Sequence, residues 1–264
     1  MSLRISIARW AGLSALLALT ACEIGTAPEA GNGLQAPPPA NLQNQAIAAP
    51  PPPEPLLDRE ALLIAAIRAR SAAATGVDDR ESQAPLDGRR FSFRIPLGCD
   101  LVEGAAADGA ARHDPTTRRV ALSVAAELTA EHPLAKAIAG DTFEAVEGFW
   151  IADPWLLAPH CGPGDAGAAP IGIAQFFTAE DPRGGRRSGR PYEAREDYRE
   201  GETPAAGDWE LVLAGRLRKI GERVFHCQVS ADGAPPACII SARFDQVEIV
   251  NRRTGARLAE WRAG

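Results

Sequence analysis

The chain has 264 residues, of which 45% are hydrophobic and 23% are charged, and its formal net charge at pH 7 is −6. This composition is ordinary for a globular protein. A mildly acidic chain is not built to neutralise phosphates, so the charge balance argues against nucleic acid as a partner. After residue 21, no apolar run reaches the roughly 18 residues of a membrane-spanning helix.

The first 21 residues have the parts of a secretory signal peptide. Arg4 and Arg9 supply the positively charged region, and residues 10–19 form an apolar stretch that is too short for a stable membrane span. The segment ends in Leu19-Thr20-Ala21-Cys22. This order resembles the lipobox of bacterial lipoproteins, in which a Leu and two small residues precede a Cys.

The resemblance covers residues 1–22 only, and it implies how the chain is anchored. It implies that the thiol of Cys22 receives a diacylglyceryl group, that cleavage occurs just before this residue, and that the new amine is acylated, for example by palmitate. Several acyl chains hold a protein stably on a membrane, whereas one chain is marginal. Glu23 is not the Asp that in many such lipoproteins directs retention in the inner membrane. The resemblance therefore implies the periplasmic face of the cell outer membrane.

Residues 22–55 are predicted to be a disordered, Pro-rich tether. Proline runs at residues 37–39 and 50–53 favour extended polyproline II structure. At about 3.1 Å per residue, a fully extended segment of this length would reach on the order of 100 Å. A Pro-rich ligand for another protein is the alternative interpretation.

A helix is predicted over residues 56–70. Asp58 can cap its N-terminus, Glu60 favours the first turn, and Leu63 and Ile67 fall one helical turn apart on an apolar stripe. Residues 71–86 are polar and are predicted to be a flexible linker.

Residues 87–264 are predicted to form one globular, mainly β domain. Phe91, Phe93 and Ile95 alternate with polar residues, which is the period of a strand. Asp114-Pro115 supplies turn chemistry for a hairpin over residues 110–125, and a short helix is predicted within residues 127–140. Further strands are predicted at 171–178, 210–217, 223–230, 238–244, 247–251 and 257–261. Without βαβ alternation, this pattern predicts a single disulfide-bonded antiparallel sandwich or barrel.

Four cysteines remain in the domain, and an even number in an exported protein indicates disulfides. Three pairings are possible for Cys99, Cys161, Cys227 and Cys238. We favour Cys227–Cys238, because the two strands flank a loop rich in turn residues, and this leaves Cys99–Cys161. His160 and His226 precede two of these cysteines, but the spacing of zinc motifs is missing. No metal and no cofactor are expected.

The sequence carries no motif of a known catalytic centre: GxSxG, HExxH, GxxxxGK and GxGxxG are all missing. His113 lies just before the Asp114-Pro115 turn and His132 just before Pro133, and both are predicted to be structural. Asp141, Glu144 and Glu147 could serve a hydrolase as paired carboxylates, although their spacing is not diagnostic. No catalytic residue is therefore predicted.

Two segments are candidates for ligand binding. The first holds Trp150 and Trp155 on either side of an Asp-Pro turn, where the rings could stack on a sugar or peptide and Asp153 could form a hydrogen bond. The alternative is that a Trp packs in the core near a Cys99–Cys161 bridge.

The second candidate segment is the Arg-rich stretch 180–208, which is predicted to be a long loop. Arg186 and Arg187 could grip a carboxylate or a phosphate. A solvated insertion is the alternative.

Together these features predict an outer-membrane-anchored periplasmic lipoprotein that acts as a non-enzymatic binding or interaction module of the cell envelope. Peptidoglycan or another envelope protein is the expected partner. The alternative is a periplasmic hydrolase that acts on an envelope polymer. Residues 87–264 resemble no family through their motifs.

Overall fold

The computed structural model describes residues 54–104, 110–152, 156, 158–161, 171–181, 190–230 and 233–263. The lipidation site Cys22, the tether except for Glu54 and Pro55, and the candidate ligand-binding residues Asp153, Trp155, Arg186 and Arg187 lie outside the described residues. Pro52–Gly264 form one compact unit.

The described residues are mainly β, as predicted. The helices are α1 (Arg59–Thr75), α2 (Arg80–Gln83), the 3₁₀ helix η1 (Ala84–Leu86) and α3 (Pro133–Ala139). The strands are β1 (Arg90–Leu97), β2 (Leu101–Glu103), β3 (Ala111–Asp114), β4 (Arg119–Val124), β5 (Ala145–Ile151), β6 (Ile171–Phe177), β7 (Tyr192–Asp197), β8 (Trp209–Leu217), β9 (Phe225–Gln228), β10 (Ala237–Asn251) and β11 (Arg257–Arg262).

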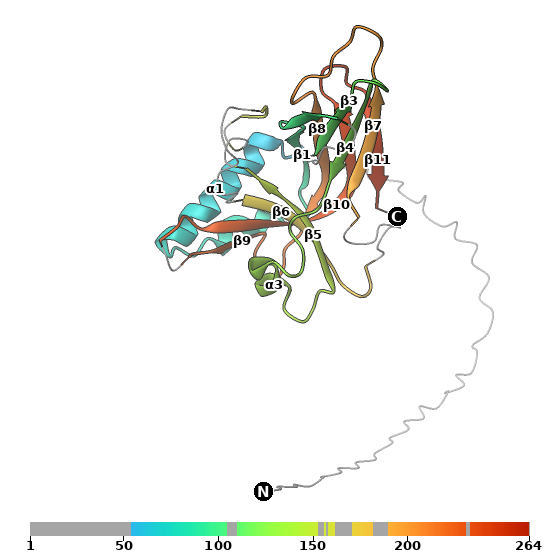
Figure 1. Cartoon of the computed structure of the whole chain (residues 1–264). Coiled ribbons are helices and arrows are strands. Elements are labelled where there is room, and N and C mark those ends of the chain that lie inside the picture. Colours follow the sequence, from blue (N-terminus) through green and yellow to red (C-terminus); the bar gives the residue numbers. More distant parts are fainter. Residues whose placement is uncertain are drawn as a thin grey trace, which may run out of the picture. The chain divides into compact units, whose positions relative to one another are not determined.

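The strands form two sheets. The seven-stranded sheet has the order β1-β8-β10-β6-β5, with β9 and β11 also paired to β10, and the four-stranded sheet has the order β2-β3-β4-β7. In Figure 1, β3, β4 and β7 lie beside β8 and β11, whereas α1 and α3 lie near the end of the large sheet that holds β9, β6 and β5. Helices and the small sheet thus cover different parts of the large sheet.

The long strand β10 organises the large sheet. Its first half pairs with β6 and β9, and its second half pairs with β8 and β11. A bulge between Phe244 and Gln246 interrupts the pairing with β8. The bulge moves the buried positions from even to odd residue numbers, so that Phe244 is followed by Val247 and Ile249 in the core. The two strands predicted at 238–244 and 247–251 are therefore one bulged strand.

Most of the described strand pairs are antiparallel, as predicted, but two are parallel. β6 pairs parallel with β10, and β2 pairs parallel with β3. Three strands lie between β6 and β10 in the chain, including β7 of the small sheet, and this long crossover lets β10 return in the direction of β6.

Helix α1 belongs to the compact unit. The carboxylate of Asp58 accepts a hydrogen bond of 2.9 Å from the N–H of Ala61, as a cap should, and Gly76 ends the helix in the left-handed conformation. One face of α1 packs in the main core of the sheets, through Leu62, Leu63, Ala66 and Ala69. A domain boundary at residue 87 is therefore wrong.

The prediction of a flexible linker over residues 71–86 is also wrong. Helix α1 runs to Thr75, and α2 and η1 follow. The side chain of Gln83 is only 3% exposed, and its Oε1 accepts the backbone N–H groups of Val224 (2.9 Å) and Phe225 (2.8 Å). This buried amide fixes the segment against the start of β9.

Both disulfides have the predicted pairing. Cys99 is bonded to Cys161, and Cys227 is bonded to Cys238. Cys227 and Cys238 lie directly opposite each other in the β9–β10 register. Among the described residues, no group of three or more His, Cys, Asp or Glu side chains could hold a metal ion.

The carboxylate of Glu196 joins the two sheets. From β7 it accepts hydrogen bonds from the indole N–H of Trp209 (2.7 Å), the amide of Asn251 (2.8 Å) and the hydroxyl of Tyr198 (2.9 Å). Trp209 and Asn251 are fully buried, so their donors depend on this acceptor. Burial and the bond to Glu196 raise the pKa of Tyr198 above its usual value.

We predict that Glu196→Ala lowers the free energy of unfolding by about 3 kcal/mol, because buried donors are left without an acceptor. Glu196→Gln should cost less, since its amide oxygen can still accept. Urea unfolding measures the change, and Glu193→Ala, at an exposed position of β7, is the matched control. Equal midpoints for the two alanine variants would contradict the role of Glu196.

Candidate functional site

The first predicted binding segment contributes Trp150 to a core. Trp150 lies on β5 and is half-buried against the smaller core beneath α3. Its ring meets the edge of the His132 ring, with 5.2 Å between the centroids, and it crowds the position that a Cβ of Gly172 would take. The packing alternative thus holds for Trp150, although at a different place from the expected Cys99–Cys161 bridge.

The carboxylates proposed for a hydrolase do not share one environment. Asp141 and Glu144 are exposed, whereas Glu147 is buried and its carboxylate accepts a hydrogen bond from the hydroxyl of Tyr192. Glu131, Glu144 and Glu147 line a cavity of about 230 Å³, and Asp141 is not part of the lining. The described lining contains no histidine and no hydroxyl nucleophile other than that of Thr129.

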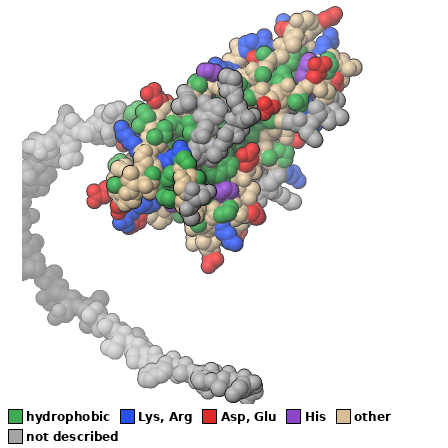
Figure 2. Space-filling view, turned by 60° about the vertical axis from the view of Figure 1, so that its left-hand side comes forward, with side chains coloured by type: hydrophobic (Ala, Val, Ile, Leu, Met, Phe, Trp, Pro, Cys, Tyr) green, Lys and Arg blue, Asp and Glu red, His purple; other side chains and the backbone are tan. Residues whose placement is uncertain are grey.

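The Arg-rich segment is not one long loop. Strand β7 occupies Tyr192–Asp197 and pairs with β4 in the small sheet. Arg195, on this strand, is exposed. On the face shown in Figure 2, acidic and basic side chains of the described residues are interspersed, which gives no broad basic surface there.

A histidine and a serine that the sequence did not single out as a pair lie close together. Nε2 of His226 is 3.5 Å from Oγ of Ser241. Ser241 is fully buried, and its hydroxyl is within hydrogen-bond distance of the carbonyl oxygens of Arg218 (2.6 Å) and Val224 (3.0 Å). Burial lowers the pKa of His226 to about 4, so the ring is neutral near pH 7. Because the Ser241 hydroxyl is buried and already lies within hydrogen-bond distance of two carbonyl oxygens, the pair has a structural role and does not form a nucleophilic centre.

A groove lies beside β9, and we call it the β9 groove. Its volume is about 620 Å³, in the range of ligand-binding pockets. Its lining comes from the end of α1 (Ala69, Ala73, Gly76, Val77, Asp78), from α3 (Leu134, Ala137, Ile138) and from β9 and its flanks (Arg223, Phe225, His226, Cys227, Gln228, Val229). Three segments far apart in the sequence therefore form it.

Side chains from both faces of β9 line this groove, so the outer edge of the strand faces it. Among the described residues, β9 pairs with β10 alone. The N–H of Ser241 in β10 donates to the carbonyl of Val224. In an antiparallel pair, every second residue bonds to the partner strand, so in this register His226 and Gln228 also direct their backbone groups toward β10. Phe225 and Cys227 consequently direct their N–H and C=O groups away from β10. The N–H of Phe225 is taken up by Gln83, and the edge is open from there onward.

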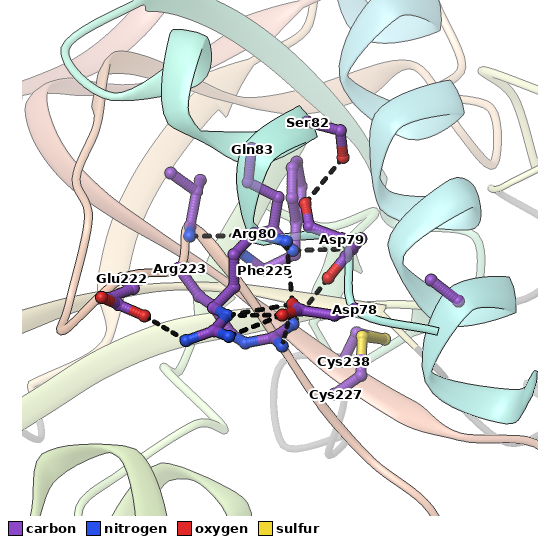
Figure 3. A network of polar contacts seen from close by, with 12 residues as sticks. Asp78, Asp79, Arg80, Ser82, Gln83, Glu222, Arg223, Phe225, Cys227 and Cys238 are labelled. Atoms are coloured by element: carbon purple, nitrogen blue, oxygen red, sulfur yellow. Dashed lines mark hydrogen bonds and ion pairs between the residues drawn. A yellow bond between two sulfur atoms is a disulfide. The ribbon is translucent and has the colours of Figure 1, made fainter. Parts of the chain in front are cut away.

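A network of ion pairs closes one end of the groove. The guanidinium of Arg223 lies 2.6 Å from Asp79 and 3.1 Å from Asp78, and Arg80 binds Asp78 and Glu222 (Figure 3). Hydrogen bonds from Arg80 lower the pKa of Asp78 to about 2. Asp78 and Arg223 are the formally charged residues of the described lining, and they are paired with each other, so this lining has no net charge.

Two of the apolar side chains that line the groove are exposed to solvent. Val77 is 60% exposed and Val229 is 56% exposed, which places both among the most exposed large hydrophobic residues described. Their apolar surface would be buried by an occupant of the groove.

No protein-family model, no curated protein and no solved structure matches the chain. Among the described residues, no helix is both long enough and apolar enough to cross a membrane. The function is therefore inferred from the geometry of the groove and from the N-terminal sequence.

We predict that His226 makes stability depend on pH. Its folded pKa of about 4 lies below the ordinary value of 6.5. Between these values the unfolded chain binds a proton that the folded chain does not, so stability is lost as the pH falls from about 6.5 to 4, by roughly 2–3 kcal/mol. Urea midpoints measured across this range should fall less steeply for His226→Gln than for the parent chain.

His160→Gln is the matched control, because His160 is exposed. A parallel loss of stability in the parent chain and in both variants would show that His226 does not titrate in this way.

Proposed function

We propose that this chain is a lipid-anchored lipoprotein on the periplasmic face of the outer membrane, and that its β unit binds a protein partner of the envelope in the β9 groove. The observation that carries the binding role is the open edge of β9 within an apolar, uncharged groove. The lipobox-like Leu19-Thr20-Ala21-Cys22 supports the anchor.

The composition of the groove favours a protein over a glycan. Half of its described lining residues are Ala, Val, Leu or Ile, which bury apolar surface. Among the described lining residues, the one Phe, Tyr or Trp side chain is Phe225, which is buried in the main core and offers no exposed face for stacking on a sugar. Trp150 does not line the groove.

The chemistry of the groove favours binding over hydrolysis. Asp78 and Arg223 are held in ion pairs, and His226 is neutral and lies beside a buried hydroxyl. A general base needs a proton to abstract within hydrogen-bond reach, and the described hydroxyl near His226, that of Ser241, already has two carbonyl oxygens within that reach.

The anchor is tested by replacing the thiol that would carry the lipid. We expect Cys22→Ser to abolish incorporation of labelled palmitate and to move the chain out of the outer-membrane fraction, because the serine hydroxyl does not form the thioether. Glu23→Gln is the control and should keep both the label and the location. Incorporation of palmitate by the Cys22→Ser variant would refute the assigned site.

The groove is tested by blocking it. We expect Ala73→Arg to reduce cross-linking of the chain to its partner in intact envelopes at least tenfold, because Ala73 lines the groove and a long charged side chain would fill it. Ala74→Arg is the matched control, since the neighbouring Ala74 is exposed and does not line the groove. The photo-reactive group would be placed at Val229.

Two results would contradict the proposal. One is equal cross-linking by the Ala73→Arg and Ala74→Arg variants. The other is co-sedimentation with purified peptidoglycan that survives Ala73→Arg and is lost on Trp155→Ala, which would move the binding site to the Trp-rich segment.

A further inference from the structure

We infer that the ligand of the β9 groove is an uncharged, extended polypeptide segment that adds to β9 as one more strand. This inference rests on the proposed function and names the ligand class that the groove takes. Its basis is the position of the backbone N–H and C=O groups on the outer edge of β9, to which no described strand is hydrogen-bonded.

The backbone of β9 offers hydrogen bonds in the right direction. In the β9–β10 register, Cys227 is opposite Cys238, and their Cα atoms are 4.0 Å apart. So short a separation marks a pair whose N–H and C=O groups point away from each other. The next outward position is Val229, which directly follows the last residues of β9. An added strand would bond to the C=O of Phe225, to both groups of Cys227 and to the N–H of Val229.

Apart from its short length, this edge lacks the features that usually prevent such pairing. Edge strands are commonly guarded by charged side chains, by Pro or by a bulge. Phe225-His226-Cys227-Gln228-Val229 contains no charged side chain near neutral pH and no Pro, and its register with β10 is continuous. A short strand with an unguarded edge that still lies inside a groove is the arrangement of proteins that bind peptides by strand addition.

The groove has two walls for the side chains of an added strand. Phe225 and Cys227 lie on the side of α1, because both pack with the main core to which α1 contributes. His226 and Gln228 therefore face the other side, toward α3. Alternate ligand side chains would meet Ala69, Ala73 and Val77 on one wall and Leu134 and Ile138 on the other. Small residues on the α1 wall leave room for larger ligand side chains.

Charge and shape exclude other occupants of this groove. Because the paired Asp78 and Arg223 leave the lining without net charge, a charged ligand would lose hydration without gaining a partner. A second copy cannot deliver its own β9, since that strand lies between the same two helices. A single extended segment can enter. At about 3.3 Å per residue, the four residues of β9 match a ligand segment of roughly four to six residues.

The test removes one outward N–H while the β9–β10 pairing is kept. In Val229→Pro the outward N–H is lost, and Pro is tolerated where the N–H of an edge strand faces away from its neighbour. Val229→Ala is the matched control, because it removes the same side chain but keeps the N–H. An intact Cys227–Cys238 bond and equal urea midpoints would show that both variants of the full chain are folded.

The probe is a capped hexapeptide of alternating Thr and Val, together with the same peptide N-methylated at every amide. We expect the unmethylated peptide to bind the parent chain and Val229→Ala, and to bind Val229→Pro at least fivefold more weakly. The amides of Cys227 and Val229 should exchange with solvent more slowly when the peptide is bound. The fully methylated peptide, which cannot donate, should not bind.

The outcomes separate this inference from the proposed function. Equal binding to the Val229→Pro and Val229→Ala variants, or no binding of the peptide, overturns strand addition. If Ala73→Arg still abolishes cross-linking in envelopes, the groove remains the binding site by another mode. If Ala73→Arg affects neither the peptide nor the cross-link, both proposals fail. A dimer in sedimentation equilibrium that Val229→Pro dissociates would identify a second copy as the occupant, and would overturn the inference.

Discussion

Strand β10 is the constraint on which the rest of the structure depends. Its 15 residues pair with four strands, two along each half, so any shift in its register would displace β6, β8, β9 and β11 together. The bulge near Asp245 re-phases the strand and bends it. One half of the large sheet can thereby be flanked by α1 and α3, while the other half lies beside the small sheet (Figure 1).

The same strand explains how an open edge stays ordered. Strand β1 pairs with β8 as far as Arg216, so no outer strand continues beside β9. The side chain of Gln83 accepts the first outward N–H of that edge, which belongs to Phe225. The Cys227–Cys238 bond holds the four residues of β9 against β10. A disulfide that closes a short loop restricts the unfolded chain, which offsets the weak pairing of so short a strand. The edge can therefore remain available without fraying.

The features that could be predicted from the sequence are those that depend on residues close together in the chain. The alternation of Phe91, Phe93 and Ile95, the cap at Asp58 and the Cys227–Cys238 pairing all follow from residues within one element or next to one loop, and Cys99–Cys161 follows by elimination. Strand β5 was missed because it is apolar almost throughout: Val146 packs beneath α3 and Phe149 packs in the main core, so both faces are covered and no alternation appears. Strand β7 was missed because Tyr192 and Ala194 are its only buried apolar residues.

The groove itself could not be predicted, because its chemistry resides in backbone atoms rather than in side chains. The N–H and C=O of Cys227 become significant only once the fold leaves them unpaired between two helices. Recognition through the backbone selects weakly among sequences, and a segment of four to six residues makes few hydrogen bonds. Under the proposed anchoring, specificity would come largely from location: a tether on the outer membrane confines the groove to a thin layer and raises the effective concentration of any partner held there. The anchor and the groove would then both be needed for specific binding, because the anchor would restrict which partners are nearby and the groove would bind one of them.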